Sequence, residues 1–323
     1  MTKHGRACPR RVPELTASFA RLVGQALVSL AMLSAVVFVI SRSTGNPLDL
    51  MLPPDATSET YERAARSLGL DQSSVIQYGL FALSAVKGDF GRSLRSGEPV
   101  GALLVERLQA SLPLASLALV LSLGGGIPLG VLAAVHRGGR MDSAASGVAM
   151  LGQSLPTFWV GIALVQVFAV GLGWLPAGMI SGAGSIVLPA VTLSLNGVAV
   201  LARLVRSAML EVLRADFVRL ARAKGLSEGR VIWGHALKNA LPSVASYAGI
   251  LFANFMTLAI VVEVVFAWPG LGQLTYTAIV NRDFPVVQGV TLLGGALTIV
   301  VSLCVDALLG YLDPRIRNSG EAA

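Results

Sequence analysis

Charged residues are missing from five long stretches of the chain, and this pattern predicts most of its structure. A helix needs about 20 mostly apolar residues to cross the hydrocarbon core of a bilayer. Four of the stretches have a length that suits one membrane-spanning helix each, with some allowance for tilt. The stretches without Asp, Glu, Lys or Arg cover residues 22–41, 108–135, 143–202, 240–262 and 284–305.

The stretch over residues 143–202 is too long for a single span. It contains "GLGWLPAGMISGAGS" at residues 171–185, where five glycines, a proline and Trp174 indicate a turn with an aromatic residue at the membrane interface. We therefore expect an all-α polytopic membrane protein with six spans. Their expected ranges are 22–41, 111–136, 144–170, 186–206, 241–264 and 286–310.

The polar residues divide the rest of the chain. Within the segment 42–107, "SETYERAARSLGL" predicts a short helix that stops at Gly69, and an apolar run of about 12 residues from Val75 is too short to cross a bilayer. This segment either caps the helical bundle or contacts a delivered ligand or protein. The expected organisation is a leader at 1–21, a first span at 22–41, an external segment at 42–107, a transmembrane domain at 108–312 and a tail at 313–323.

Residues 207–240, between the fourth and fifth expected spans, carry a helical pattern instead of an apolar one. From Ser207 to Lys224 there is neither Gly nor Pro, and apolar side chains recur at steps of three or four residues. This spacing predicts one amphipathic helix. The apolar positions on its expected face are Met209, Leu213, Phe217 and Leu220.

A bend is predicted directly after this helix. Gly225 stands where a helix favours a left-handed C-terminal residue, and Ser227 suits the N-cap of a second helix. Leu226 and Val231 are spaced as a hydrophobic staple across that N-cap. We name this helix–glycine–helix segment, residues 207–240, the elbow.

The composition fits a membrane protein: 54% of residues are hydrophobic, 13% are charged, and the mean hydropathy is +0.70. If the N-terminus is cytoplasmic, 17 of the 25 Lys and Arg residues fall on the cytoplasmic side, eight of them in residues 203–238. Basic loops stay inside, so we expect both termini of this multi-pass membrane protein in the cytoplasm. Cys8 and Cys304 are far apart in sequence and predict neither a disulfide nor a metal site.

The basic elbow has two interpretations. Its side chains could hold anionic lipid headgroups, or the elbow could dock in a groove of a cytoplasmic partner. Small residues at Ala221, Ala223 and Gly225 favour docking, because they allow another backbone to come close.

Glu263 also has two interpretations. An acid near the outer end of a span could line a substrate path, or it could accept hydrogen bonds from the adjoining "WPGLG" loop at 268–272. The sequence has no G-x-x-x-x-G-K-[ST] motif, so it predicts no nucleotide site on this chain.

Several motifs, in order along the chain, resemble one known family. They include "KGDFGRSLRSGEPV", "GIPLGVLAAVHRGGRMD", "LGQSLPTFWVGI", "LVRSAMLEVLRADFVRLARAKGLS", "VVEVVFAWPGLG" and "LLGYLDPRIR". This series resembles the permease subunits of ABC importers that work with a solute-binding protein, in the dipeptide, oligopeptide and nickel branch. The resemblance implies the type I ABC importer permease fold, and it identifies the elbow as the family's "EAA" coupling loop, although Arg219, Leu220 and Ala221 replace the literal Glu-Ala-Ala.

The same resemblance implies roles and partners. The chain would hold no cofactor, because ATP and Mg would bind separate ATPase subunits, and it would not itself be an enzyme. Its partners would be a second homologous permease, two cytoplasmic ATPases and an external solute-binding protein. The cargo would be di- or oligopeptides, with nickel chelates, glutathione or opine-like solutes as alternatives. If the resemblance did not hold, the alternative function would be an ion-coupled secondary transporter. The implied ATPase-coupling residues are Asp216, Arg219, Ala221, Arg222, Ala223, Lys224, Gly225 and Leu226, and Glu263 is the candidate for the translocation path.

Overall fold

The computed structural model describes residues 12–43, 48, 52, 56–67, 69, 71–180 and 182–312. It divides into two compact units, Met1–Lys87 and Gly88–Ala323. Within the described residues every regular element is a helix, apart from one isolated bridge between Arg92 and Pro99. The expected all-α fold is therefore confirmed. Residues 1–11 of the leader and the tail 313–323 lie outside the described residues.

The first unit contains three described helices, α1 (Val12–Ser43), α3 (Ser58–Ser67) and α4 (Ser74–Val86). α1 begins ten residues before the expected first span, inside the predicted leader. α4 packs against α1, with the ring of Phe38 5.5 Å from that of Tyr78 and the Ser34 hydroxyl 2.8 Å from the Tyr78 hydroxyl. Gly69 has a φ of +64°, which agrees with the predicted helix stop.

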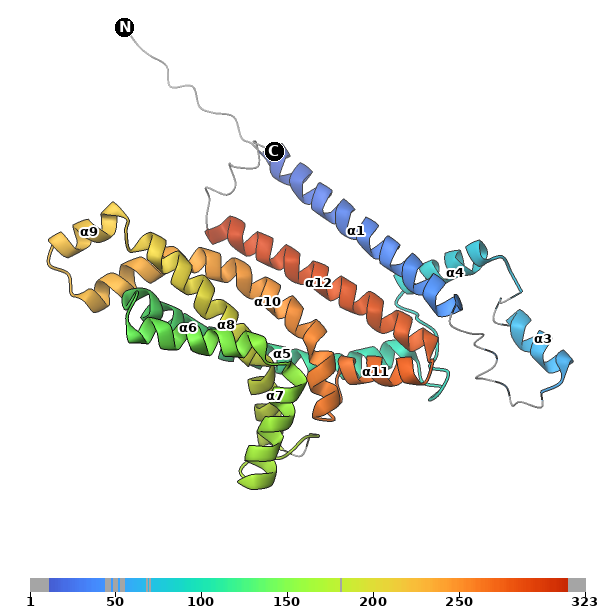
Figure 1. The fold of residues 1–323 in the computed structure, drawn as a ribbon. Helices are drawn as coiled ribbons and strands as arrows, with labels where there is room; N and C mark the ends of the chain where they lie inside the picture. Colours follow the sequence, from blue (N-terminus) through green and yellow to red (C-terminus); the bar gives the residue numbers. More distant parts are fainter. Residues whose placement is uncertain are drawn as a thin grey trace, which may run out of the picture. The chain divides into compact units, whose positions relative to one another are not determined.

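The second unit begins at Gly88, and its first helix, α5, starts at Val100. It is built from long helices joined by short turns (Figure 1). Its elements are α5 (Val100–Val135), α6 (Arg140–Ser154), α7 (Thr157–Leu164), η1 (Val165–Gly171), η2 (Ala183–Ile186), α8 (Val187–Val212), α9 (Asp216–Ala223), η3 (Arg230–Ala236), α10 (Leu237–Val265), α11 (Leu271–Val280) and α12 (Phe284–Leu312).

Five apolar segments of the described chain are long enough to cross a membrane. A sixth span is possible only as a bent pair, because α6 and the α7–η1 helix meet at 102°. The single helix expected over 144–170 is therefore replaced by two helices. Pro156 has no N–H to continue α6, and its ring drives Leu155 into an extended conformation with ψ of 130°, so the helix ends there. The five unbent spans are Gly24–Ser41, Val100–Val135, Gly184–Val212, Arg230–Val265 and Phe284–Val305.

Close contact between α5 and α8 forms the centre of the second unit. A Cβ atom added to Gly126 would lie 2.7 Å from Leu201 Cβ, and one added to Gly130 would lie 2.6 Å from Val205 Cβ. Such distances are shorter than any van der Waals contact, so only glycine permits this approach of the two backbones. In Figure 1, α9 lies at one end of the bundle formed by α5, α8 and α10, and α11 lies at the other end.

Candidate functional site

The elbow contains the last six residues of α8, then α9, the bend at Gly225, η3 and the first four residues of α10. The structure differs from the prediction in one respect: the helix expected from Ser207 to Lys224 is interrupted between Val212 and Asp216. The turn is closed by bonds of the i to i−3 type, from Arg214 N–H to Glu211 and from Ala215 N–H to Val212. α9 therefore changes direction and packs on η3.

Packing inside the elbow explains this interruption. Val218 of α9 and Val231 of η3 are fully buried against each other, with Ala221 beside them. Phe217 and Leu220, which the helical spacing assigned to the apolar face, are 42% and 56% exposed. Burial of Val218 and Ala221 against η3 thus outweighs the continuity of the helix that local sequence favours.

The bend itself was predicted correctly. Gly225 has a φ of +77°, the left-handed region that glycine enters without steric cost. The N–H of Gly225 donates to Arg222 O (2.9 Å) and the N–H of Leu226 donates to Ala221 O (3.3 Å). This pair of bonds is a Schellman motif, and Leu226 completes it by packing on the Val218–Ala221–Val231 cluster.

An ion pair crosses the bend on the solvent side. Arg222 donates from Nε to Glu228 Oε1 (2.8 Å) and from Nη2 to Glu228 Oε2 (3.3 Å). Within α9, Arg219 lies 3.5 Å from Asp216 on an exposed face. Ala223 and Lys224 are exposed as well. Of the predicted coupling residues, Ala221 and Leu226 therefore pack inside the elbow, and the other six lie on its surface.

Glu263 lies in the last turn of α10, at the end of the unit that carries α11, and it is fully buried. Its Oε1 accepts a hydrogen bond from Ser111 Oγ (2.6 Å), and its Oε2 accepts from the backbone N–H groups of Gly272 (2.6 Å) and Gln273 (3.1 Å). The carboxylate therefore holds the first turn of α11, where helix N–H groups lack partners of their own. Of the two interpretations of Glu263, this geometry supports hydrogen bonding to the adjoining loop.

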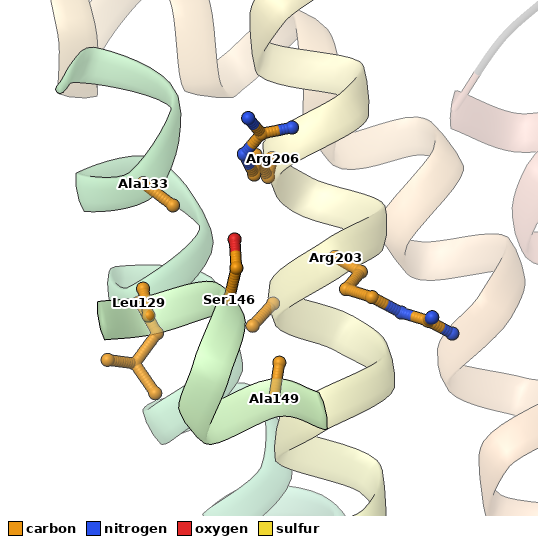
Figure 2. A pocket seen from close by; sticks show the side chains of 8 residues that line it. Leu129, Ala133, Ser146, Ala149, Arg203 and Arg206 are labelled. Carbon is orange, nitrogen blue, oxygen red and sulfur yellow. The ribbon is translucent and has the colours of Figure 1, made fainter. Parts of the chain in front are cut away.

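The sequence interpretation missed one charged pair, between α6 and α8. Arg206 Nε and Nη2 donate to the two carboxylate oxygens of Asp142 over 2.7 and 2.8 Å, and Gly138 N–H donates to Asp142 Oδ2 (2.9 Å). Figure 2 shows Arg206 and Arg203 on α8, beside Ser146 of α6, with their side chains directed differently. The available signal was weak: an acid that follows two arginines in "HRGGRMD".

Comparison with known families matches residues 126–318 to the family described as "Binding-protein-dependent transport system inner membrane component". The match spans more than half of the chain and includes the elbow. The chain belongs to this family. It is the permease subunit of a binding-protein-dependent ABC importer and a multi-pass protein of the inner membrane, so it works with ATPase and binding-protein components. Membership also decides against the ion-coupled secondary transporter.

Relatives of this permease match along nearly their whole length. A putative peptide transport system permease protein of Brucella abortus (strain 2308) is 39% identical over 312 residues, which cover 94% of this chain and 99% of the relative. The oligopeptide transport system permease protein AppB of Bacillus subtilis (strain 168) is 35% identical, with 92% and 99% covered. The glutathione transport system permease protein GsiC of Escherichia coli (strain K12) is 37% identical, with 92% and 97% covered.

A solved structure agrees with the fold. A chain from the inward-facing MetNI methionine ABC transporter superimposes with a TM-score of 0.57 and 21% identity, covering 65% of this permease and 96% of that chain. The helices are thus arranged as in an ABC transporter permease, as the resemblance implied.

Proposed function

We propose that this permease carries di- or oligopeptides, or similar small solutes, into the cytoplasm, and that its elbow receives the motion of a cytoplasmic ATPase. The observation that carries the proposal is the division of α9 into two faces. Val218 and Ala221 fix the helix to η3, whereas Phe217 and Leu220 stay exposed beside arginines. Exposed aromatic and aliphatic side chains with a charged rim are typical of a protein-docking surface.

The elbow can pass a movement of α9 on to the membrane-spanning helices α8 and α10. The buried Val218–Val231 contact and the Arg222–Glu228 pair connect its two arms, and the Schellman motif fixes the bend between them. η3 leads without interruption into α10, and only three residues separate α9 from α8. A force on α9 therefore reaches two membrane-spanning helices through bonded and packed structure.

The remaining partners follow from this role. The permease pairs with a second, similar permease to enclose a pathway, each elbow seats on one of two ATPase subunits, and a binding protein delivers cargo at the opposite end. Both chain termini then lie on the elbow side, in the cytoplasm. The concentration of Lys and Arg in residues 203–238 supports this orientation, because basic loops remain inside.

The relatives support a peptide-like cargo. Their names include peptide, oligopeptide and glutathione transport, and all three cargoes are short chains with peptide bonds and free carboxylates. Nickel chelates and opine-like solutes are the less supported alternatives.

The proposal is tested by measuring uptake into liposomes that contain the reconstituted transporter. The solute offered is the one that copurifies with its binding protein. Uptake should require ATP and both ATPase subunits. Leu220→Asp should lower uptake at least about tenfold, because a charge would be buried in the docking groove. Met141→Asp is the matched control, since Met141 is 50% exposed but lies on α6.

Two results would overturn the proposal. One is uptake that continues without ATP, and the other is a Leu220→Asp variant that transports normally. The lipid-headgroup interpretation predicts something different: uptake that falls when anionic lipid is removed from the membrane and does not respond to Leu220→Asp.

A further inference from the structure

A cavity of about 350 Å³ opens at the α11 end of the unit Gly88–Ala323, opposite the elbow. Its walls come from the turn at residues 93–98, from α5, from α11 and from the connection that leads into α12. This volume lies in the range of small-molecule sites. Four ionisable side chains line the cavity: Arg95, Glu98, Arg107 and Asp283.

The carboxylate of Asp283 is buried and accepts hydrogen bonds from the protein itself. Asp283 is 4% exposed, its Oδ2 accepts from Ser93 Oγ (2.5 Å), and its Oδ1 accepts from Leu94 N–H (3.1 Å). Ser93 Oγ in turn accepts from the N–H of Ser96 (3.0 Å). The buried carboxylate thus fixes the 93–98 turn in place, and among the described residues it forms no hydrogen bond or ion pair with either arginine of the cavity.

The two arginines retain unused donors. Arg95 is exposed and donates from Nη1 to Asn281 Oδ1. Arg107 projects from the second turn of α5, and its Nε is buried without a hydrogen-bond partner among the described residues. Its contact with Glu106, at 3.8 Å, is too long for a hydrogen bond. The Arg107 side chain is 27% exposed, so its terminal N–H groups are the donors that a ligand in the cavity can reach.

The chemistry of these groups defines the ligand. A guanidinium presents its donors as a planar fork that fits the two oxygens of a carboxylate. The exposed carboxylate of Glu98 lines the same cavity and offers the opposite charge. A ligand with both an ammonium and a carboxylate satisfies both ends.

We propose that this cavity binds a small zwitterionic solute, with its carboxylate on Arg107 and Arg95 and its ammonium toward Glu98. The solute class rests on the proposed function, since a free peptide carries both groups. The cavity then receives cargo on the delivery side, before the cargo enters the pathway between the permeases.

The test uses the full transporter in nanodiscs, without nucleotide and without the binding protein. Saturation-transfer NMR measures the Kd of dialanine and of its C-terminal amide. Dialanine should bind, and loss of the carboxylate in the amide should weaken binding at least about tenfold. Arg107→Gln should have a similar effect. Arg282→Gln is the matched control, because it removes one positive charge from the connection after α11 without lining the cavity.

Three results would overturn this inference: no binding of dialanine, equal binding of the amide, or equal weakening by Arg282→Gln. Suppose that the transporter does not bind dialanine and that Arg107→Gln weakens docking of the binding protein. The cavity would then bind an acidic side chain of that protein instead. ATP-driven uptake into liposomes that contain the same transporter, with its binding protein added, separates the two proposals. If uptake still depends on ATP and on Leu220 while dialanine fails to bind, only the cavity assignment is lost.

Discussion

The guanidinium of Arg222 and the carboxylate of Glu228 face each other across the Gly225 bend and make two hydrogen bonds, of 2.8 and 3.3 Å. Arg222 belongs to α9, and Glu228 stands two residues before η3. The pair therefore closes the solvent side of an elbow whose inner side is closed by Val218 and Val231. Contacts on both sides of the bend make the two arms one body.

A double-mutant cycle should detect this pair. Both side chains are about half exposed, so Arg222→Gln and Glu228→Gln should each cost little, with an interaction energy of about 0.5 kcal/mol that falls as salt is raised. Thermal unfolding of the permease in nanodiscs measures the cycle. Arg219→Gln is the control, because its contact with Asp216 stays within one turn of α9. Strictly additive single variants would contradict the prediction.

The Gly225 bend should tolerate alanine poorly. No atom lies within 4 Å of the position of a Cβ at residue 225, so the cost of Gly225→Ala is conformational and amounts to about 1 kcal/mol. Gly225→Asn should cost less, because Asn enters the left-handed region more readily. Limited proteolysis at the elbow and the Tm both report the change.

Gly229 provides the matched control for this substitution. It has equally open surroundings but a helical φ of −58°, so Gly229→Ala should be neutral or stabilising. Equal effects at Gly225 and Gly229 would show that backbone conformation is not the cause.

The sequence alone predicted those structural features that depend on residues close together in the chain. Gly225, Leu226 and Val231 occur at the spacing that a left-handed bend and a hydrophobic staple require, and the structure has both features. Pro156 is an equally local signal for the bend between α6 and α7, and a prediction from the length of the apolar stretch alone does not include it.

Other features depend on contacts that sequence does not reveal. Residues 213–215 contain no Gly or Pro, so nothing local marks the break before α9, which follows from Val218 packing on η3. Asp142 and Arg206 are 64 residues apart and pair only because α5 and α8 bring α6 alongside. Burial of Val218 and Ala221 likewise leaves Phe217 and Leu220 outside, a division of faces that the three- and four-residue spacing does not reveal.

Removal of the Glu263 carboxylate should destabilise the turn before α11. Glu263→Ala leaves Ser111 Oγ and the N–H groups of Gly272 and Gln273 without their buried acceptor, a loss of about 2 kcal/mol or more. Glu263→Gln keeps one acceptor oxygen and should be milder. The Tm of each variant in nanodiscs measures the effect, with ATP-driven uptake measured in parallel.

The two readouts also separate the two roles of Glu263. Anchoring of the α11 turn predicts that uptake and Tm fall together, and that Ser111→Ala lowers the Tm in part, because Leu271 N–H loses its acceptor. Uptake that falls at an unchanged Tm would instead assign Glu263 to the translocation path.

Substitutions of Asp142 and Arg206 should have non-additive effects on the Tm. The Asp142 side chain is 9% exposed and that of Arg206 is 31% exposed, so either single variant leaves a partly buried charge without its partner. Asp142→Asn and Arg206→Gln should each lower the Tm, and the double variant should lower it by less than their sum. Arg203→Gln is the control: Arg203 lies one turn earlier on α8 and lines a small pocket together with Arg206, but it has no part in the pair (Figure 2). If Arg203→Gln lowered the Tm as much as Arg206→Gln, general loss of charge at the end of α8 would explain both, and the specific tie between α6 and α8 would be wrong.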